Sequence, residues 1–362
     1  MTRTQQSVAA IEAYRVVCLG GGTGLSTILR GLKHLVFLSG QTVEAPPPSC
    51  ISQLTAVVTV TDDGGSSGRL RKELNVPPPG DIRNCMVALA EDEALMARLF
   101  QYRFSAGAGL EGHNFGNLFL TALANLRGDF AEAVKVSSQI LKTRGDIVPS
   151  TTSDVQLRAQ MADGTTVRGE TRITASKSRI LKLEMEPPDA APLPNTLEEI
   201  AAADLITIGP GSLFTSLIPN LLVHGIPEAI RDSRALKVYV GNLMTQANES
   251  LGMSASQHIE ALFQHAGGKF FDYALLNGTP VPAGMIERYA AEGAEPITID
   301  LDSVRALGVE PVLGEYLGPG EIARHNADRI AHDLMQLLSE RNRAGNDDRA
   351  TMIANAEKSA HR

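Results

Sequence analysis

The feature that most constrains the fold of this chain is a unit in which an apolar run leads through glycines into a helical pattern. Residues 15–20 (RVVCLG) are largely apolar, GGTG follows, and the next residues carry apolar side chains at helical spacing. Apolar runs followed by glycine-containing loops return at 204–208 and 235–240. Strands that alternate with helices predict an open, mostly parallel sheet with helices on both faces, and hence a doubly wound α/β fold.

The middle of the chain follows a different pattern. The stretch VQLRAQMADGTTVRGETRI alternates with a period of two residues and turns at Asp163-Gly164, which favours a β-hairpin. We expect residues 151–190 to form an antiparallel insertion in a single Rossmann-like α/β domain over residues 15–340. Residues 1–14 are expected to be a flexible N-terminus, and the polar residues 341–362 to be a disordered tail.

The spacing of apolar residues and the positions of Asn, Asp and Ser predict further elements. Strands are expected over 54–60, 273–276 and 297–299. Helices are expected to begin at Asp81, near Asn114 and at Asp129, and to cover 254–265 and 327–338. In this pattern Asp81 is a natural N-cap, because a carboxylate there accepts from the free N–H groups of a first helical turn.

The composition limits the class of protein. The chain has 362 residues, 43% of them hydrophobic, and a net charge of −8, which argues against general affinity for nucleic acid or acidic membrane surfaces. We expect no membrane insertion, since no apolar run reaches membrane-spanning length. The cysteines Cys18, Cys50 and Cys85 form neither a disulfide framework nor a zinc pattern, which favours the reducing cytoplasm. The sequence leaves a homo-oligomer open.

The first glycine turn is a candidate phosphate-binding site, because glycine backbone at a helix N-terminus offers unhindered N–H donors. Its residues are Gly20, Gly21, Gly22, Thr23 and Gly24. The dinucleotide-binding fingerprint is only partly matched, and no Gly-Lys-Ser/Thr follows as in a P-loop. NAD-dependent oxidoreduction is disfavoured, since the next acidic residues come about forty positions after Gly22 instead of roughly twenty. A tight turn without a ligand is the alternative.

An acidic pair, Asp62 and Asp63, directly follows the second apolar run. The two carboxylates have three interpretations: they hold Mg²⁺, they bond sugar hydroxyls, or one of them caps the turn through Gly64-Gly65. Asp81 suits a second metal or hydroxyl ligand, so the tentative Mg²⁺ site consists of Asp62, Asp63 and Asp81. These three aspartates are also the candidates for any catalytic role. The arginines of the following GRLR can supply compensating positive charge.

Other loops carry more polar residues than packing requires. These are Asn84 in GDIRNC, His113, Asn114 and Asn117 in GHNFGN, Gly211 and Ser212 in GPGSLF, and Asn242 and Thr245 in GNLMTQ. A lone histidine such as His113 is more typical of a structural hydrogen bond than of a metal ligand. Ligands of open α/β sheets bind outside the carboxyl ends of the strands. We therefore expect these loops to surround one crevice for a nucleotide or a sugar nucleotide.

Taken in order, these stretches resemble a known family. GGGTGL, VTVTDDGGSSGRLR, PPGDIRNC, GHNFGN, GPGSLFTSLIPNL and YVGNLMTQ resemble the motifs of the YvcK/CofD-like family, from about Arg15 to about His332. For the YvcK-like branch, the gluconeogenesis factors, the resemblance implies cytoplasmic binding of UDP-N-acetylglucosamine and a regulatory role in cell shape and envelope synthesis, with no demonstrated catalysis. That branch's uridine-contacting Tyr and Arg fall on Tyr289 and Arg324.

The transferase branch of the same family implies an alternative function. Its member 2-phospho-L-lactate transferase moves a phospholactyl group from a guanylyl carrier onto a deazaflavin precursor. The resemblance places that branch's metal-binding acids on Asp62 or Asp63 and on Asp81, whereas the loop DDGGSSGRLR differs from the transferase pattern. We therefore expect a UDP-sugar-binding regulatory protein, and keep a Mg²⁺-dependent transferase as the alternative.

Overall fold

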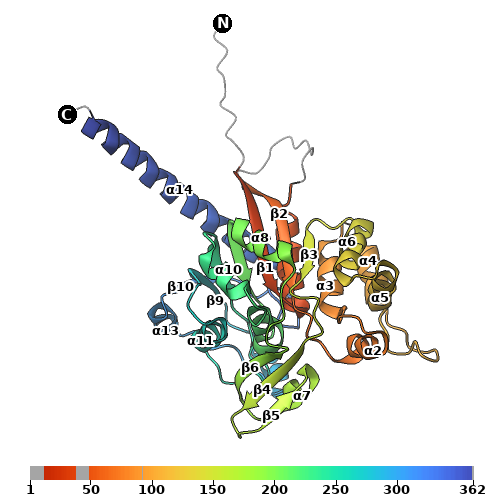
Figure 1. Cartoon of the computed structure of the whole chain (residues 1–362). Helices are drawn as coiled ribbons and strands as arrows, with labels where there is room; N and C mark the ends of the chain where they lie inside the picture. The colour runs from red at the N-terminus through yellow and green to blue at the C-terminus, as the bar shows by residue number, and fades with distance from the viewer. Residues whose placement is uncertain (1–11, 38–48, 92, 361–362) are drawn as a thin grey trace.

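The body of the protein is a seven-stranded parallel sheet in a computed structural model that describes residues 12–37, 49–91 and 93–360. Its strands, in sheet order, are β10 (Glu310–Gly314), β9 (Tyr273–Asn277), β8 (Leu236–Val240), β7 (Leu205–Ile208), β1 (Glu12–Gly20), β2 (Ser49–Val58) and β3 (Asp146–Pro149). Every neighbouring pair is parallel. Figure 1 shows this sheet at the centre of the molecule. The expected α/β fold is confirmed.

The strand order reverses beside β1. The chain starts in the middle of the sheet, moves outward through β2 to β3, and then returns to β7 on the other side of β1. In register, Leu19 of β1 is the partner of Ile208 of β7, so both strands end at the same level. This is the Rossmann-like order with an added edge strand, and the point of reversal is where such sheets bind their ligands.

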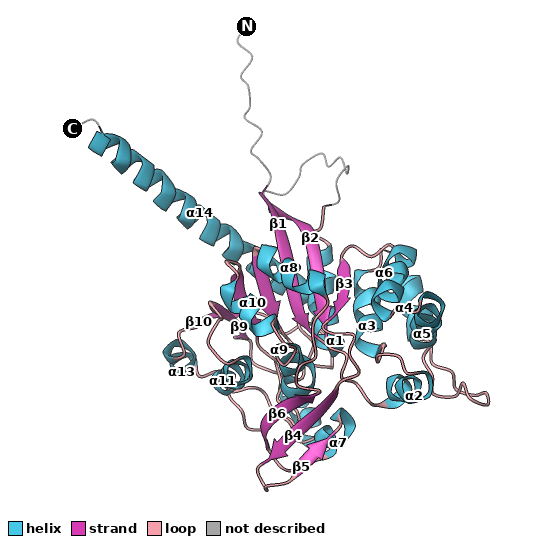
Figure 2. Ribbon diagram, in the orientation of Figure 1, coloured by secondary structure: helices cyan, strands magenta, loops and turns pink. Residues whose placement is uncertain are grey.

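Helices cover both faces of the sheet, as Figure 2 shows. On β1, Val16 and Cys18 belong to one buried core and the alternating Val17 and Leu19 to the other. The first core includes residues of α1 (Gly22–Lys33), α2 (Gly65–Leu74), α3 (Gly80–Leu89), α4 (Glu93–Gln101), α5 (Phe115–Arg127), α6 (Phe130–Leu141) and α14 (Ala327–Ala360). The second includes residues of α8 (Pro194–Ala202), η1 (Leu213–Leu217), α9 (Ile218–Leu221), α10 (Ile226–Asp232), α11 (Ala255–Ala266) and α13 (Leu301–Ala306).

The expected antiparallel insertion is present as a separate three-stranded sheet in the order β5-β4-β6. It consists of β4 (Gln156–Met161), β5 (Thr166–Arg168), α7 (Glu170–Ala175) and β6 (Ile180–Glu186). The turn between β4 and β5 is held by Asp163, whose Oδ1 accepts from the Thr165 N–H at 2.9 Å. In Figure 1 the insertion lies below the parallel sheet, at the end where β1 finishes.

Several helices start where short polar side chains predict. Asn114 caps α5 by accepting from the Gly116 N–H at 2.9 Å, and Asp129 caps α6 by accepting from the Glu132 N–H at 2.7 Å. Ser254 forms a capping box at the start of α11. These helix starts depend on local hydrogen bonds, which is why the sequence predicts them well.

Two expectations about elements of the domain are wrong. Asp81 is not an N-cap: α3 begins at Gly80, and Asp81 lies inside its first turn. Residues 297–299 are not a strand, because the Ile297 N–H donates to the Leu243 carbonyl in the loop after β8 instead of pairing with the sheet.

Two expectations about the chain ends are also wrong. Residues 12–14 were expected to be flexible, but they belong to β1, because Glu12 to Tyr14 pair with β2 from Ser49. The rest of the expected N-terminal segment lies outside the described residues. The helix α14 continues to Ala360 where a disordered tail from 341 was expected. Its packed first turns, with Ile330 and Leu334 buried, provide the nucleus from which polar residues without proline extend it.

Two expectations came from the composition: no membrane insertion, and no disulfide framework among the cysteines. Among the described residues, no single helix has the length and apolar character to cross a membrane; η1 and α9 reach it only together with α10, across a bend of 75°. Cys18, Cys50 and Cys85 are all free and buried. Burial raises the pKa of Cys18 to about 12, so this thiol is an inert part of the core.

The contact between α1 and α14 can be tested with a glycine. A methyl group at Gly31 would collide with the carbonyl oxygen of Ala327, which is fixed backbone. We expect Gly31→Ala to lower the free energy of unfolding by about 1–3 kcal/mol, measured by urea denaturation. Gly284, in α12 (Ala283–Ala291), is the matched control, because a methyl group added there would have no atom within 4 Å. Gly284→Ala should be neutral or stabilise by up to about 1 kcal/mol; equal losses in both variants would contradict the close helix contact.

Candidate functional site

A hollow of about 220 Å³ lies at the point where the strand order reverses. It is formed by the loops that follow β1, β7 and β8, together with residues near the C-terminus of the domain. The structure brings nine of the candidate residues together in its lining: Gly21, Gly22, Thr23, Gly24, Gly211, Ser212, Asn242, Thr245 and Tyr289. The adjacent Gly20 is the last residue of β1.

Glycine is required where the first two loops meet. A Cβ at Gly24 would collide with the backbone carbonyl of Pro210, so no larger residue allows this approach. Gly22 has a φ of +61°, a conformation that side chains rarely adopt. At these glycines the loops after β1 and β7 present bare backbone to the hollow, next to Thr23, Ser212 and Ser216.

The loop after β7 leads into the π-helix η1, a rare element that often occurs at functional sites. The Ser212 carbonyl accepts from the N–H groups of Ser216 and Leu217, at 2.8 and 3.0 Å. The Ser212 hydroxyl accepts from Nε2 of Gln246 at 2.7 Å. Ser216 and Gln246 also line the hollow, and the sequence analysis did not select them. The sequence did contain a signal for these two residues, since both lie in or beside the polar loops that follow strands.

Asn242 and Thr245 have structural partners. The Asn242 side chain accepts from the Gly211 N–H at 2.9 Å and donates to the Gly211 carbonyl at 2.7 Å. The buried Thr245 accepts at Oγ1 from the Glu295 N–H at 3.0 Å. Both were expected to contact a base or a sugar. In this structure they hold the shape of the hollow, Asn242 by fixing Gly211.

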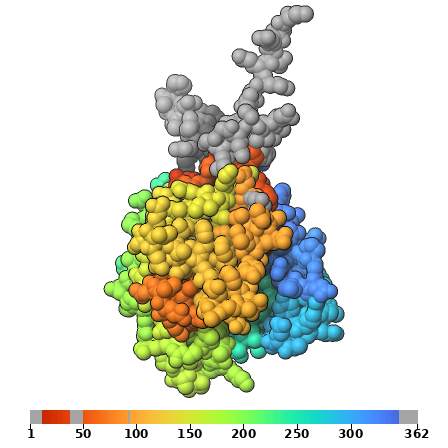
Figure 3. All heavy atoms as spheres, turned by 90° about the vertical axis from the view of Figure 1, so that its right-hand side faces the viewer, coloured from red at the N-terminus to blue at the C-terminus, as the bar shows by residue number. Residues whose placement is uncertain are grey.

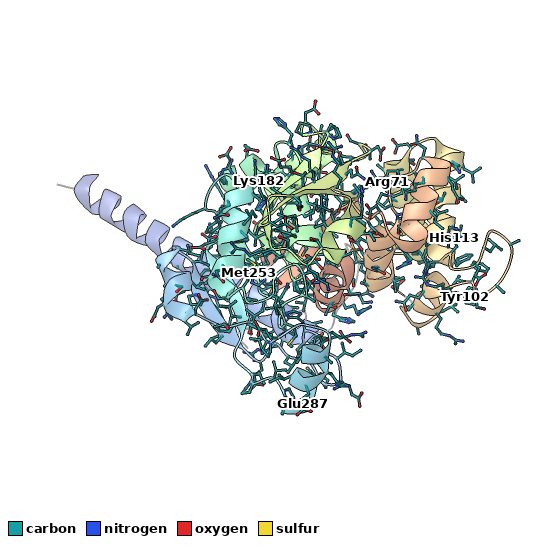
Figure 4. All side chains as sticks on the ribbon, turned by 90° about the horizontal axis from the view of Figure 1, so that it is seen from below. Arg71, Tyr102, His113, Lys182, Met253 and Glu287 are labelled. Carbon is teal, nitrogen blue, oxygen red and sulfur yellow. The ribbon has the colours of Figure 1, made fainter. Side chains whose placement is uncertain are left out.

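The rim of the hollow comes from α12 and from residues 323–325. The Tyr289 hydroxyl accepts from the Ala323 N–H at 3.1 Å, and His325 bonds the Gly241 carbonyl through Nε2 at 2.9 Å. Burial lowers the pKa of His325 to about 4, so this ring is a neutral N–H donor near pH 7. Arg324 lies between these two attachments and is exposed, outside the lining itself. Figure 4 shows α12 at the edge of the molecule, marked by Glu287.

The acidic pair at the end of β2 has two different roles. Asp62 accepts from the Gly64 N–H at 2.9 Å and thus caps the glycine turn, one of the interpretations left open above. Asp63 accepts from the N–H and the hydroxyl of Thr171, at 2.8 and 2.6 Å. Because Thr171 belongs to α7, Asp63 fastens the insertion to the parallel sheet.

Asp81 lies against the first glycine turn. Its carboxylate faces the Gly22 N–H, and its Oδ2 would be 2.6 Å from a Cβ at Gly21. Burial, together with the nearby Asp62, raises the pKa of Asp81 to about 6. An acidic side chain thus faces one of the backbone donors that the sequence assigns to phosphate.

A further carboxyl group beside these aspartates, Glu170 of α7, was not predicted from the sequence. Its Oε2 accepts from the Thr61 hydroxyl at 2.9 Å, and burial together with Asp62 and Asp81 raises its pKa well above the usual range. No sequence signal could have found it, because a single Glu in the insertion reaches this place only through tertiary contacts. Asp62, Asp81 and Glu170 thus influence one another, and Asp63 and Glu249 also act on members of this group.

The tentative Mg²⁺ set does not fit a shared metal site in this arrangement. Asp63 is directed to Thr171, whereas Asp81 is directed to Gly22. Over residues 12–37, 49–91 and 93–360, no group of three or more His, Cys, Asp or Glu side chains is placed to hold a metal ion. Mg²⁺ binding remains a prediction.

The remaining candidates near α2 to α5 lie outside the hollow and have protein partners of their own. Asn84 and Asn117 both accept from the guanidinium of Arg83, at 2.8 and 3.0 Å. His113 bonds the Ser66 hydroxyl through Nδ1 at 3.1 Å, the structural role expected for it. Figure 4 places His113 on the same lobe as Tyr102. The motifs DDGGSSGRLR, GDIRNC and GHNFGN thus come together beside the hollow rather than within it.

Two other hollows are relevant by size or position. One of about 840 Å³ lies beside β3 and α6 and contains none of the candidate residues. A second, of about 240 Å³, shares Asn242 and Leu243 with the hollow at the point of reversal. It is lined largely by apolar residues, among them Val281 and Ile297. The two adjoining hollows together offer a polar part and an apolar part.

The chain belongs to the CofD family: the family model described as 2-phospho-L-lactate transferase CofD matches residues 16–317. A gluconeogenesis factor of Halalkalibacterium halodurans is 45% identical over 89% of this chain and 95% of its own length. The gluconeogenesis factor of Bacillus subtilis is 43% identical over 90% and 98%. A crystal structure of an upf0052 family member from Bacillus halodurans superposes with a TM-score of 0.83 at 44% identity, over 90% of this chain and 99% of that one. The family resemblance of the motifs is confirmed.

The attachment of the insertion can be tested at Asp63. Asp63→Ala removes both bonds from Thr171 and should lower the free energy of unfolding by about 1–3 kcal/mol, with faster amide hydrogen exchange in α7. Asp189→Ala, an exposed carboxylate at the end of the insertion, is the control and should change neither. Unchanged exchange in α7 would show that Asp63 does not hold it.

The raised pKa of Asp81 predicts a dependence of stability on pH. The pKa of Asp81 is about 6 in the folded chain, against an ordinary value of 3.8. Between pH 3.8 and 6 the folded state therefore binds more protons than the unfolded state, and the protein loses stability as the pH rises through this range. Asp81→Asn cannot ionise, and it should be more stable than the native protein by about 1–3 kcal/mol near pH 8. The advantage should disappear near pH 4. Urea denaturation at both pH values measures it, and an equal difference at both would contradict the assignment.

Proposed function

We propose that this protein is a regulatory protein of the gluconeogenesis factor type that binds the nucleotide sugar UDP-N-acetylglucosamine in the cytoplasm. The observation that carries the proposal is the meeting of the glycine backbones after β1 and β7 at the point of reversal of the strand order. This is the place where doubly wound sheets bind nucleotides. The function consists of ligand binding without turnover.

The diphosphate is proposed to lie over the first turn of α1 and the start of η1. N–H groups in a first helical turn lack partners within the helix and favour negative charge. The Ser212 and Ser216 side chains line the same hollow and can donate to phosphate oxygens. The facing carboxylate of Asp81 is then close to the ligand, where it can accept from a sugar hydroxyl.

Arg324 and Tyr289 are proposed to hold the rest of the nucleotide. Among the described residues, no hydrogen bond or ion pair involves the Arg324 guanidinium, which leaves it free to pair with the diphosphate. The neighbouring backbone is fixed, since Ala323 and His325 are attached to Tyr289 and Gly241. The adjoining apolar hollow of about 240 Å³ is suited to a base or to an acetyl group.

The names of the relatives support the regulatory role. Proteins called gluconeogenesis factors match this chain over nearly all of their length and of its own. A role in cell shape and envelope synthesis follows from the same resemblance, because UDP-N-acetylglucosamine is a precursor of the envelope. The description of the family model supports the second candidate, a Mg²⁺-dependent phospholactyl transferase.

Calorimetric titration of the full chain with UDP-N-acetylglucosamine tests the proposal. Arg324→Ala should weaken binding about tenfold or more, since it removes a charge-assisted contact to phosphate. Arg305→Ala, an exposed arginine on α13, should bind as the native protein does. No heat with the native protein, or the same affinity in both variants, would reject the proposed ligand.

A second measurement separates the two candidate functions. The full chain is incubated with Mg²⁺, a guanylyl phospholactate donor and a deazaflavin acceptor, and products are followed by mass spectrometry. We expect none. A product that requires Mg²⁺ and disappears in Asp62→Asn would establish the transferase in place of the binding protein.

A further inference from the structure

Three arginines from different elements gather around the segment 111–117, which contains the motif GHNFGN. Arg69 of α2 donates to the Glu111 carbonyl at 2.8 Å, and Arg103, after α4, donates to the Gly112 carbonyl at 2.7 Å. Arg83 of α3 donates to Oδ1 of Asn117 at 3.0 Å. Figure 3 views this side, where the orange and yellow atoms of α2 to α6 form one continuous surface above the green insertion.

These arginines are bonded only to neutral oxygen atoms. Among the described residues, none of the three forms an ion pair with a carboxylate. Arg83 is held by two amide oxygens, and its Nε is buried without a hydrogen-bond partner. Three guanidinium groups without a paired carboxylate are unexpected on a chain with a net charge of −8.

The arginines are also held in place by close packing. A Cβ at Gly116 would be 2.8 Å from Cγ of Arg83, and one at Gly112 would be 3.0 Å from Nη2 of Arg69. The backbone of Arg103 forms an antiparallel bridge with Asn114. The side chains are therefore oriented before any ligand arrives, which lowers the entropic cost of binding.

The charged neighbours of the cluster are unevenly distributed. Asp62 and Asp81 lie near Arg83 and favour its charged form, whereas burial and Arg103 lower its pKa. Burial, Arg69 and Arg103 lower the pKa of His113, whereas the nearby Glu73 raises it. The acidic groups therefore lie near Arg83 and His113. Within the described part of the chain, the exposed Arg103 has no acidic group among its contacts.

We propose that Arg69, Arg83 and Arg103 form a second anion-binding site, for a small molecule that carries a phosphate or carboxylate group. The planar guanidinium fork binds such oxyanions through paired N–H groups. Arg103 is exposed and the other two are half-buried, so each of the three is at least partly accessible from the surface. None of them lines the hollow at the point of reversal, so this site does not depend on the proposed nucleotide function.

Asp81 lies between the two sites. It faces the Gly22 N–H of the hollow on one side and influences the charge of Arg83 on the other. A bound anion would add negative charge on the arginine side of Asp81.

Calorimetric titration of the full chain with inorganic phosphate tests the site. We expect binding in the millimolar range or tighter, weakened about tenfold or more in Arg103→Gln, which removes a charge-assisted contact. Arg98→Gln, an exposed arginine of α4, is the matched control and should bind as the native protein does. Arg103 is exposed, so its variant should fold; an unchanged melting temperature without phosphate verifies this.

Two further arms locate the anion and identify its chemistry. Arg324→Ala should retain phosphate binding; its loss there, with Arg103→Gln unaffected, would place the phosphate in the nucleotide hollow and overturn the proposal. Competition with malonate distinguishes a carboxylate from a phosphate ligand. Displacement of bound phosphate by malonate indicates that the site prefers carboxylates, and retention of phosphate indicates that it prefers phosphate. No binding of either anion at millimolar concentration would also overturn the site.

Discussion

The parallel pairing of β1 with β7 is the contact on which the candidate site depends. The two strands end in register, so their loops leave the sheet side by side although they are far apart in the chain. Gly24 then lies so close to Pro210 that no side chain fits between the loops. Part of the wall of the hollow is bare backbone for this reason, and α1 begins beside it at Gly22.

Carboxylates beside such a loop are a conflict only if they face the same space as a bound phosphate. In this protein they are divided among different tasks. Asp62 caps a turn, Asp63 fastens α7, and Asp81, which is not part of the lining of the hollow, faces the Gly22 N–H. Arg83 adjoins Asp62 and Asp81 and offsets part of their charge.

Much of the fold could be predicted because it depends on local signals. Periodicity indicates the strands and the insertion, and short polar side chains mark the starts of α5, α6 and α11. The failures are tertiary in origin. Residues 297–299 have a strand-like composition, but Ile297 bonds Leu243 in a loop. The helix α14 continues beyond residue 340 because its first turns are packed, which the polar sequence after residue 340 does not reveal.

The sequence by itself determined that glycine-rich and polar loops follow the strands, since strand ends, turns and caps are properties of a few neighbouring residues. It therefore determined most of the lining of the hollow. Only the tertiary structure decided which polar residues face it: Asn242 is committed to Gly211, and Asn84 and Asn117 are committed to Arg83. It also brought Glu170 near Asp62 and Asp81, and it brought Arg69 and Arg103 to neighbouring carbonyl groups of one loop. Such contacts between distant segments arise from packing and leave no local pattern.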